Sequence, residues 1–126
     1  MLHPSVQVAR GVSIGRGAIA PAGVVLSAGT RIGESVFLAI NSSVGHDNEI
    51  GDFAMLGPAA ATAGDVRIGA CSVLGMGACV IQGVSIGAHT VIGAGATVVS
   101  DIGDHVVAFG TPAAVVRTRR PDDGYL

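Results

Sequence analysis

The sequence predicts an all-β fold, a parallel β-helix of a little under six coils. Three observations predict it: a six-residue repeat, 20 glycines in 126 residues, and an aromatic content of only 3%. With 49% apolar residues the chain has enough to bury, so it is not a disordered chain. The scarcity of rings excludes a core built around aromatic side chains, whereas the narrow interior of a stacked coil needs only aliphatic and small ones.

The repeat begins at Leu2, and every sixth residue up to Val98 belongs to it. Of these 17 positions, 15 are Leu, Ile or Val, and the exceptions are Ala20 and Thr62. Position five of the hexad is small or β-branched, and only Asn48 and Ile102 depart there by polarity or size. Positions five and one are two residues apart, so both point to the same face of an extended strand. Each hexad is therefore expected to be a short strand whose aliphatic and small side chains face the interior.

Position two of the hexad is often glycine, which we expect to allow the backbone dihedrals of a tight corner. Three hexads close a triangular coil, and coils stack about 4.8 Å apart through sheet hydrogen bonds. Residues one coil apart are therefore three hexads, or eighteen positions, apart in the sequence. Because the register shows no slip, we assign residues 1–103 to the β-helix. Residues 104–126 lose the pattern and are expected to form a C-terminal cap and tail, whose arginines are more often solvated than bound to phosphate.

Charge, hydropathy and cysteine usage narrow the classes of partner. The formal net charge is −2 with no basic stripe, so a nucleic-acid partner is not expected. Gly, Pro, Thr and Ser interrupt every apolar stretch, so no membrane helix is expected, and no signal segment opens the chain. Cys71 and Cys79 fall on different faces of the coil, so we expect free thiols in a reducing compartment, and therefore a cytoplasmic protein.

The histidines argue against a metal site. No two neighbours among His3, His46, His89 and His105 are separated by a whole number of coils. No two histidines are therefore expected to stack in one chain. A zinc site of the carbonic-anhydrase type is disfavoured, because it uses several histidines, and no metal is expected.

His46 has the neighbours that a catalytic histidine requires. It lies at position three, an outward corner, and Asp47 follows it directly. A carboxylate beside an imidazole raises its basicity and fixes its orientation, as a general base requires. The alternative is a solvated His–Asp pair. Gly64 lies one coil further, so the corner beyond His46 would be an open track for an extended thioester.

Five segments resemble one family. Residues 41–53 resemble the His-Asp/Glu segment of the NeuD/PglD-like sugar acyltransferases, which comprise sialic-acid O-acetyltransferases and bacillosamine-pathway N-acetyltransferases. Residues 63–69, 92–96 and the ending at 109–117 resemble the same family, and residues 3–5 resemble the start of its β-helix domain. The resemblance implies a left-handed β-helix, a homotrimer with active sites between neighbours, acetyl-CoA as donor, and an amino or hydroxyl group of a sugar as acceptor.

The resemblance also implies roles for single residues. His46 becomes the general base that deprotonates the acceptor as it attacks the thioester, and Asp47 the acid that raises the basicity of His46. Gly64, Met76 and Ala94 fall at positions that contact CoA in the family. Met76 and Ala94 are one coil apart, so they stack in one column, as a CoA arm along the prism requires.

Two departures from the family leave the acceptor open. Met55 stands where bacillosamine-pathway members commonly carry a histidine near the thioester, and it can only pack against the CoA arm or fill a subunit contact. The family's N-terminal domain, which holds the nucleotide part of the sugar, is expected to be missing. We therefore expect an acetyl-CoA-dependent sugar O- or N-acetyltransferase that works by direct attack. The alternatives are a non-catalytic hexapeptide-repeat scaffold and, less favoured, a carbonic-anhydrase-like metalloenzyme.

Overall fold

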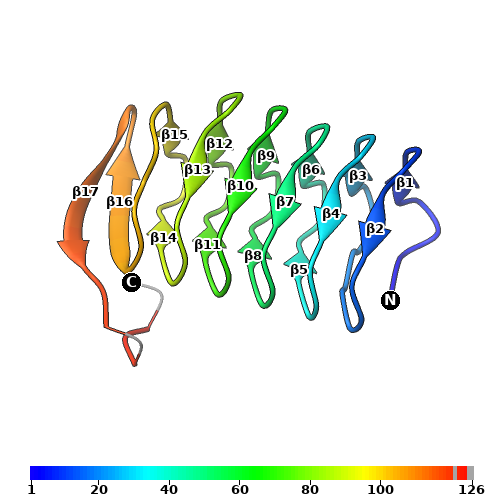
Figure 1. Ribbon diagram of the computed structural model, residues 1–126, viewed down its shortest axis with the longest axis horizontal. Helices are drawn as coiled ribbons and strands as arrows, with labels where there is room; N and C mark the ends of the chain where they lie inside the picture. The colour runs from blue at the N-terminus through cyan, green and yellow to red at the C-terminus, as the bar shows by residue number, and fades with distance from the viewer. Residues whose placement is uncertain (121, 125–126) are drawn as a thin grey trace.

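Short strands stacked into coils form a triangular prism in the computed structural model, which describes residues 1–120 and 122–124 (Figure 1). Within this range there are strands and turns and no helix. The strands are β1 (Gln7–Val8), β2 (Ser13–Ile14), β3 (Val25–Leu26), β4 (Arg31–Ile32), β5 (Phe37–Leu38), β6 (Ser43–Val44), β7 (Glu49–Ile50), β8 (Met55–Leu56), β9 (Ala61–Thr62), β10 (Arg67–Ile68), β11 (Val73–Leu74), β12 (Cys79–Val80), β13 (Ser85–Ile86), β14 (Val91–Ile92), β15 (Thr97–Val98), β16 (Val106–Gly110) and β17 (Ala113–Thr118).

Three sheets form the three faces of the prism. The β6 face has the order β1-β3-β6-β9-β12-β15, the β7 face β2-β4-β7-β10-β13, and the β8 face β5-β8-β11-β14-β16-β17. Partners on neighbouring strands are three hexads apart, as Val25 pairs with Ser43 and Ser43 with Ala61. The predicted coil of three hexads and the left-handed parallel β-helix are thus confirmed.

Positions one and five fill the interior, as predicted. Leu56 and Leu74 at position one and Val36 and Val66 at position five are completely buried. Each such side chain contributes about 2 kcal/mol of hydrophobic stabilisation. The interior also contains buried polar side chains, namely Thr30, Ser42, Asn48, Thr62, Ser72 and Thr90.

The glycines at position two have a different role from the one predicted. The left-handed φ of the corner lies at position four, where Asp47 (φ 54°) and Ala59 (φ 58°) adopt it as well as Gly77 (φ 68°). Position two instead needs glycine because the coils are close together: a Cβ on Gly51 would lie 2.6 Å from the backbone nitrogen of Ala70. The expectation of corner dihedrals at position two was therefore wrong, and the constraint there is the space between coils.

The last coil is two residues shorter than the others. Ile102 pairs with Ile86, and Val107 pairs with Val91. In each pair the separation along the sequence is two residues less than three full hexads. Ile102 therefore occupies an inward place equivalent to position one, which explains its size. The predicted register to residue 103 is wrong beyond Val98.

The shorter coil also stacks two histidines that were expected to lie apart. The rings of His89 and His105 are parallel, with centroids 5.0 Å apart. Their separation in the sequence equals that of Val91 and Val107, which pair across the shortened coil. The expectation that no two histidines stack is therefore wrong.

The C-terminal residues add a hairpin to the β8 face. β16 pairs in parallel with β14, and β17 turns back to pair antiparallel with β16. Arg119 donates from Nη1 to the carbonyl oxygen of His89 at 3.2 Å, and Arg117 forms an ion pair with Asp123 at 3.5 Å. The first contact holds the hairpin's end against the last full coil, and the second joins β17 to the residues that follow it.

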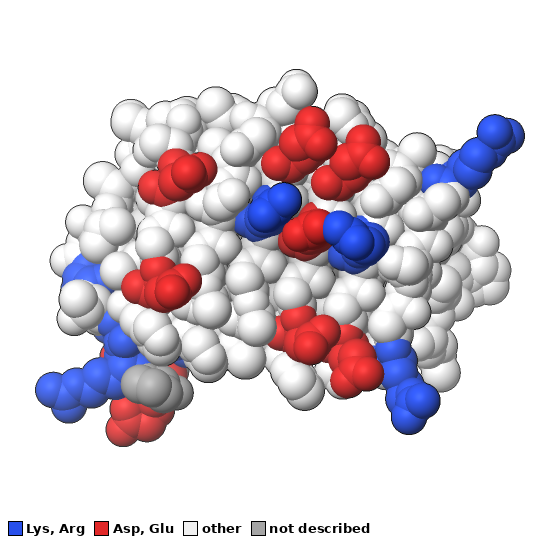
Figure 2. Space-filling view, viewed as in Figure 1, with Lys and Arg blue, Asp and Glu red and all other residues white. Residues whose placement is uncertain are grey.

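The three faces differ in the side chains that point outward. The β7 face carries a charged row in which Glu49 forms ion pairs with Arg31 and Arg67. Figure 2, in the same view as Figure 1, shows basic and acidic side chains side by side over the middle coils. The β8 face carries an apolar row consisting of Ile19, Phe37, Met55, Val73, Val91 and Val107, of which Val91 and Val107 are buried within the chain.

Cys71 and Cys79 are both free, as predicted. Among residues 1–120 and 122–124 no helix is long and apolar enough to cross a membrane.

Candidate active site

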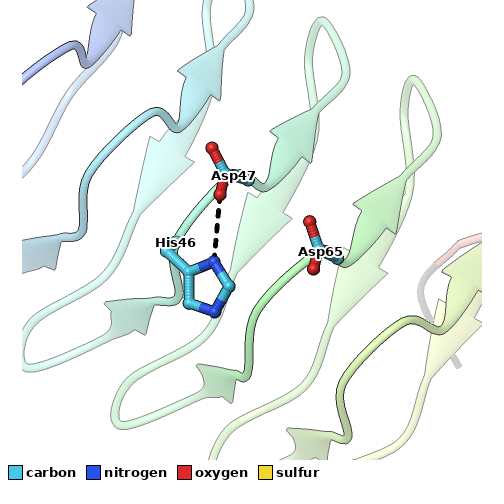
Figure 3. A group of neighbouring side chains, drawn as sticks. All are labelled: His46, Asp47 and Asp65. Carbon is cyan, nitrogen blue, oxygen red and sulfur yellow. Dashed lines mark hydrogen bonds and ion pairs between the residues drawn. The ribbon is translucent and has the colours of Figure 1, made fainter.

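The His46 corner connects β6 to β7 on the outside of the prism. The side chains of His46 and Asp47 are 53% and 63% exposed, and His46 Nδ1 lies 3.1 Å from Asp47 Oδ2 (Figure 3). Asp47 adopts a left-handed backbone conformation, which Asp tolerates better than most residues. The corner therefore directs the imidazole and the carboxylate toward each other and toward solvent.

The hydrogen bond to Asp47 determines which ring nitrogen is free. An ionised carboxylate only accepts hydrogen bonds, so Nδ1 is the donor and carries the proton. Nε2 then keeps its lone pair. It lies over Gly64 in the next coil, because a Cβ on Gly64 would overlap Nε2 and Cε1. The arrangement can accept a proton at Nε2 while Asp47 stabilises the resulting imidazolium.

Asp65 is a site residue that the sequence reasoning missed. It stacks one coil beyond Asp47, and its backbone N–H donates to the carbonyl oxygen of His46 at 2.9 Å. One ligand-type atom from each of His46, Asp47 and Asp65 lies within 4.8 Å of the others (Figure 3). The one-coil step from Asp47 to Asp65 was the signal that could have found it. The group offers one imidazole and two exposed carboxylates, which is not the three-histidine set of a carbonic-anhydrase zinc site.

Two exceptions to the repeat meet behind this corner. Asn48 is fully buried at position five, and Thr62 is the polar residue among those at position one. Thr62 Oγ1 donates to Asn48 Oδ1 at 2.5 Å, inside the prism. Sequence reasoning noted both residues as departures and gave neither a role.

The residues expected to contact CoA divide between two regions. Gly64 lies beside His46. Met76 and Ala94 lie on the corner between the β8 and β6 faces, where they line an apolar groove of about 230 Å³ together with Gly75, Val73, Val91, Ile92 and Gly93. Met55 points outward from β8 in the apolar row of the β8 face.

The groove and the His46 corner lie on different edges of the prism. The strands of the β6 face separate them, because each such strand begins after one corner and ends at the other. One chain therefore brings together His46, Asp47 and Gly64, but it does not bring Met76 and Ala94 to them. Phe109 also belongs near the groove, since its ring occupies the space over Gly93.

Comparison with family models and with curated protein sequences finds no match. Solved structures do match. Perosamine N-acetyltransferase from Caulobacter crescentus, crystallised with CoA and GDP-perosamine, has 43% sequence identity and a TM-score of 0.90 over 91% of this chain. Two of its structures are of variants in which one histidine is replaced by asparagine or alanine.

Two further structures have the same fold. The acetyltransferase domain of PglB from Neisseria gonorrhoeae, in complex with acetyl coenzyme A, has 34% identity and a TM-score of 0.90 over 91% of this chain. AntD, an N-acyltransferase from Bacillus cereus, has a TM-score of 0.90 over 94% of this chain at 17% identity, which indicates the fold alone. The chain spans 55% and 56% of the Caulobacter and Neisseria chains and 80% of AntD. In fold and in sequence, this chain is a hexapeptide-repeat β-helix of the kind that sugar N-acetyltransferases carry.

Proposed function

We propose that the protein transfers an acetyl group from acetyl-CoA to an amino or hydroxyl group of a sugar or nucleotide-sugar, with His46 as general base. The observation that carries this proposal is the His46–Asp47 hydrogen bond, which leaves Nε2 free on an open corner of the prism. The chain is also 43% identical to an enzyme crystallised with CoA and a nucleotide-sugar.

The chemistry needs no covalent intermediate on the protein. The acceptor nitrogen or oxygen attacks the thioester carbonyl carbon, and His46 Nε2 takes the proton that this atom loses. The new bond to the acetyl carbon forms, the carbon–sulfur bond breaks, and the imidazolium returns its proton to the departing CoA thiolate. Asp47 holds the Nδ1 proton throughout and stabilises the imidazolium by its negative charge.

Acetyl-CoA would lie along the groove that contains Met76 and Ala94, with Met55 on the neighbouring face. The apolar lining of this groove suits the hydrocarbon part of the CoA arm. Because the groove and His46 lie on different edges, a working site needs the groove of one copy against the His46 corner of another.

A homotrimer would supply that arrangement, since a head-to-tail ring repeats one such contact at every interface. The apolar row of the β8 face supports it: Ile19 and Phe37 are 47% and 38% exposed. Sedimentation of Phe37→Glu tests the interface, with Arg67→Gln on the charged β7 face as control. We expect only Phe37→Glu to dissociate the trimer, and a trimeric Phe37→Glu protein would contradict this interface. A cytoplasmic location, supported by the two free thiols, completes the proposal.

The direct test is the rate of acetyl transfer from acetyl-CoA to a panel of amino sugars and nucleotide-linked amino sugars. His46→Ala should reduce kcat about 10²- to 10⁴-fold, the range for loss of a general base. His3→Ala is the matched control, because His3 is an exposed histidine on the first coil. Equal rates for the wild type and His46→Ala would remove His46 from the mechanism.

Two other functions predict different results. A non-catalytic scaffold would not bind acetyl-CoA, so calorimetry that detects no heat at millimolar acetyl-CoA would favour it. The clustering of His46 with Asp47 and Asp65 is the observation that favours a metalloenzyme as an alternative. Metal analysis of the purified protein separates it from the acetyltransferase.

A further inference from the structure

We propose that Asn48 and Thr62 are positioning residues for His46, which they hold through the peptide groups around it from inside the prism. The inference rests on the proposed function, because it assigns these residues to the His46 base. Neither side chain reaches the surface: Asn48 is 0% and Thr62 7% exposed. Both therefore act through the backbone of the corner.

Asn48 bridges two coils at the level of the base. Its Nδ2 donates to the carbonyl oxygen of His46 at 3.1 Å and to that of Ala63 at 2.8 Å. Ala63 directly precedes Gly64, over which the His46 ring lies. One amide group thus ties the peptide after His46 to the peptide before Gly64.

Thr62 completes the bridge on the other side of the base. Its Oγ1 accepts from the backbone N–H of Gly45 at 3.1 Å and donates to Asn48 Oδ1 at 2.5 Å. Thr30, which lies one coil before Asn48, donates from Oγ1 to the carbonyl oxygen of Gly45 at 2.7 Å. The peptide groups immediately before and after His46 are therefore both fixed by buried side chains.

Both donors of the Asn48 amide are used. Both Nδ2 protons are donated and Oδ1 accepts, so burial leaves no unsatisfied donor on this side chain. Thr62 is one of 17 position-one residues that are otherwise Leu, Ile or Val except for Ala20. Its hydroxyl gives up part of the hydrophobic stabilisation of that place. Asn48 and Thr62 are bonded to each other behind His46. This placement indicates that the two polar side chains serve the geometry of the His46 corner rather than the packing of the interior.

The rest of the prism provides the comparison. Ser72 Oγ donates to the carbonyl oxygen of Gly87 at 2.6 Å, and Thr90 Oγ1 to that of Gly103 at 2.7 Å. These bonds correspond to the bond from Thr30 to Gly45 and support corners that carry no catalytic group. They are structural, and the bond from Asn48 to the carbonyl of Ala63 is of the same kind. The bond from Asn48 to the carbonyl of His46 also has a counterpart, because Thr90 Oγ1 donates to the carbonyl of Ala88 at 3.3 Å. What the Asn48–Thr62 pair adds to that pattern is the bond between its two side chains and the bond from the Gly45 N–H to Thr62 Oγ1.

The test uses Thr62→Val, which removes the hydroxyl and keeps the shape. We expect kcat to fall about tenfold with the KM for acetyl-CoA unchanged, because the base moves relative to the acceptor and the donor groove does not. Thr62→Ser restores the hydroxyl and should restore kcat. Ser72→Ala is the matched control and should lower the free energy of unfolding while leaving kcat at the wild-type value.

A double-mutant cycle completes the test. Asn48→Ala and Thr62→Val should be less than additive in kcat, because each removes the same bridge. If Thr62→Val loses stability as Ser72→Ala does and keeps its kcat, the pair is only structural and the inference is overturned.

A second readout does not depend on turnover. The ¹⁵N chemical shifts of the His46 ring report how the imidazole is held, and they should change in Thr62→Val and return in Thr62→Ser. Unchanged ring shifts would overturn the positioning role even in a protein without transfer activity. If the wild type shows no acetyl transfer but the His46 ring shifts still change in Thr62→Val, the proposed function is contradicted and the positioning role stands.

Discussion

The ring of His46 occupies the space in which a side chain at Gly64 would lie. Gly64 follows His46 by one coil of the prism. A Cβ built on Gly64 would overlap Nε2, Cε1 and Cδ2 of the imidazole. The position of Nε2, the proton acceptor in the proposed mechanism, therefore depends on the absence of a side chain at Gly64 in the neighbouring coil.

Gly64→Ala should accordingly displace the His46 ring with little effect on the fold. We expect kcat to fall about 10²-fold, as misplacement of a catalytic group by about 1 Å does. Gly103→Ala is the matched control, because nothing lies within 4 Å of its added Cβ. Steady-state kinetics of both variants check the prediction, and wild-type kcat in Gly64→Ala would mean that Nε2 works from another position.

The sequence predicts those features that follow from the regular step of three hexads. The coil, the inward columns and the closeness of His46 to Gly64 all follow from that one step. Asp65 follows from the same step taken from Asp47, so its place beside the site was also within reach of the sequence pattern.

Features that break the period were not predictable in the same way. The stacking of His89 on His105 needs the shortened last coil, and in the hexad pattern only the size of Ile102 at position five marks the two lost residues. The pairing of Asn48 with Thr62 crosses from one inward column to another, so periodicity identifies both as exceptions without joining them. The role of glycine at position two depends on the distance between coils, which a propensity for corner dihedrals does not report.

The two kinds of glycine should respond differently to a methyl group. In Gly51→Ala the new Cβ would lie 2.6 Å from the backbone nitrogen of Ala70, which can move only if two coils separate. We expect a loss of about 2 kcal/mol or more in the free energy of unfolding. In Gly77→Ala nothing lies within 4 Å, and only the left-handed φ of 68° opposes the side chain. That cost is about 1 kcal/mol.

Urea unfolding at one protein concentration checks the glycine prediction, since oligomers gain stability with concentration. Ala59 already holds a left-handed φ of 58° in the same kind of corner, which supports the smaller loss at Gly77. Equal losses in the two variants would contradict the distinction between stacking glycines and corner glycines.

Acid should weaken the C-terminal end of the chain. The backbone N–H of Arg120, which donates to Asp123 Oδ2 at 2.8 Å, holds the pKa of Asp123 below its ordinary value, and the charge of Arg117 acts in the same direction. A depressed folded-state pKa contributes stability above the unfolded-state pKa, and this contribution is lost as pH falls through the folded-state value. The relevant window therefore lies below the ordinary value of 3.8.

An NMR titration of the Asp123 carboxyl carbon checks this sign. We expect its inflection at lower pH in the folded chain than in the same chain unfolded in urea, with the Arg120 amide shift moving at the same pH. Asp123→Asn should abolish the pH dependence of the Arg120 amide in that window. A folded-state inflection above the unfolded one would contradict the role given to the Arg120 hydrogen bond.

Complementation between inactive copies should restore activity if the site lies between subunits. His46→Ala removes the proposed base from the β6–β7 corner, and Ala94→Glu fills the proposed donor groove with a charge that would repel the phosphates of CoA. Each variant alone should be inactive. In a head-to-tail ring of randomly mixed chains, about a quarter of the sites combine the intact His46 of one copy with the intact groove of the next.

Co-expression of the two variants with different tags, followed by purification on both, yields the mixed oligomers for the assay. We expect about a quarter of the wild-type kcat per site from such a mixture before enrichment, and no recovery when separately purified variants are combined without exchange of subunits. A chain that carries both substitutions, expressed under both tags, forms the control, because no arrangement of that chain has an intact site. A site shared by two subunits must be active wherever one subunit supplies an intact His46 and its neighbour an intact groove. Mixed oligomers as inactive as the single variants would therefore show that His46 and the donor groove do not form one site.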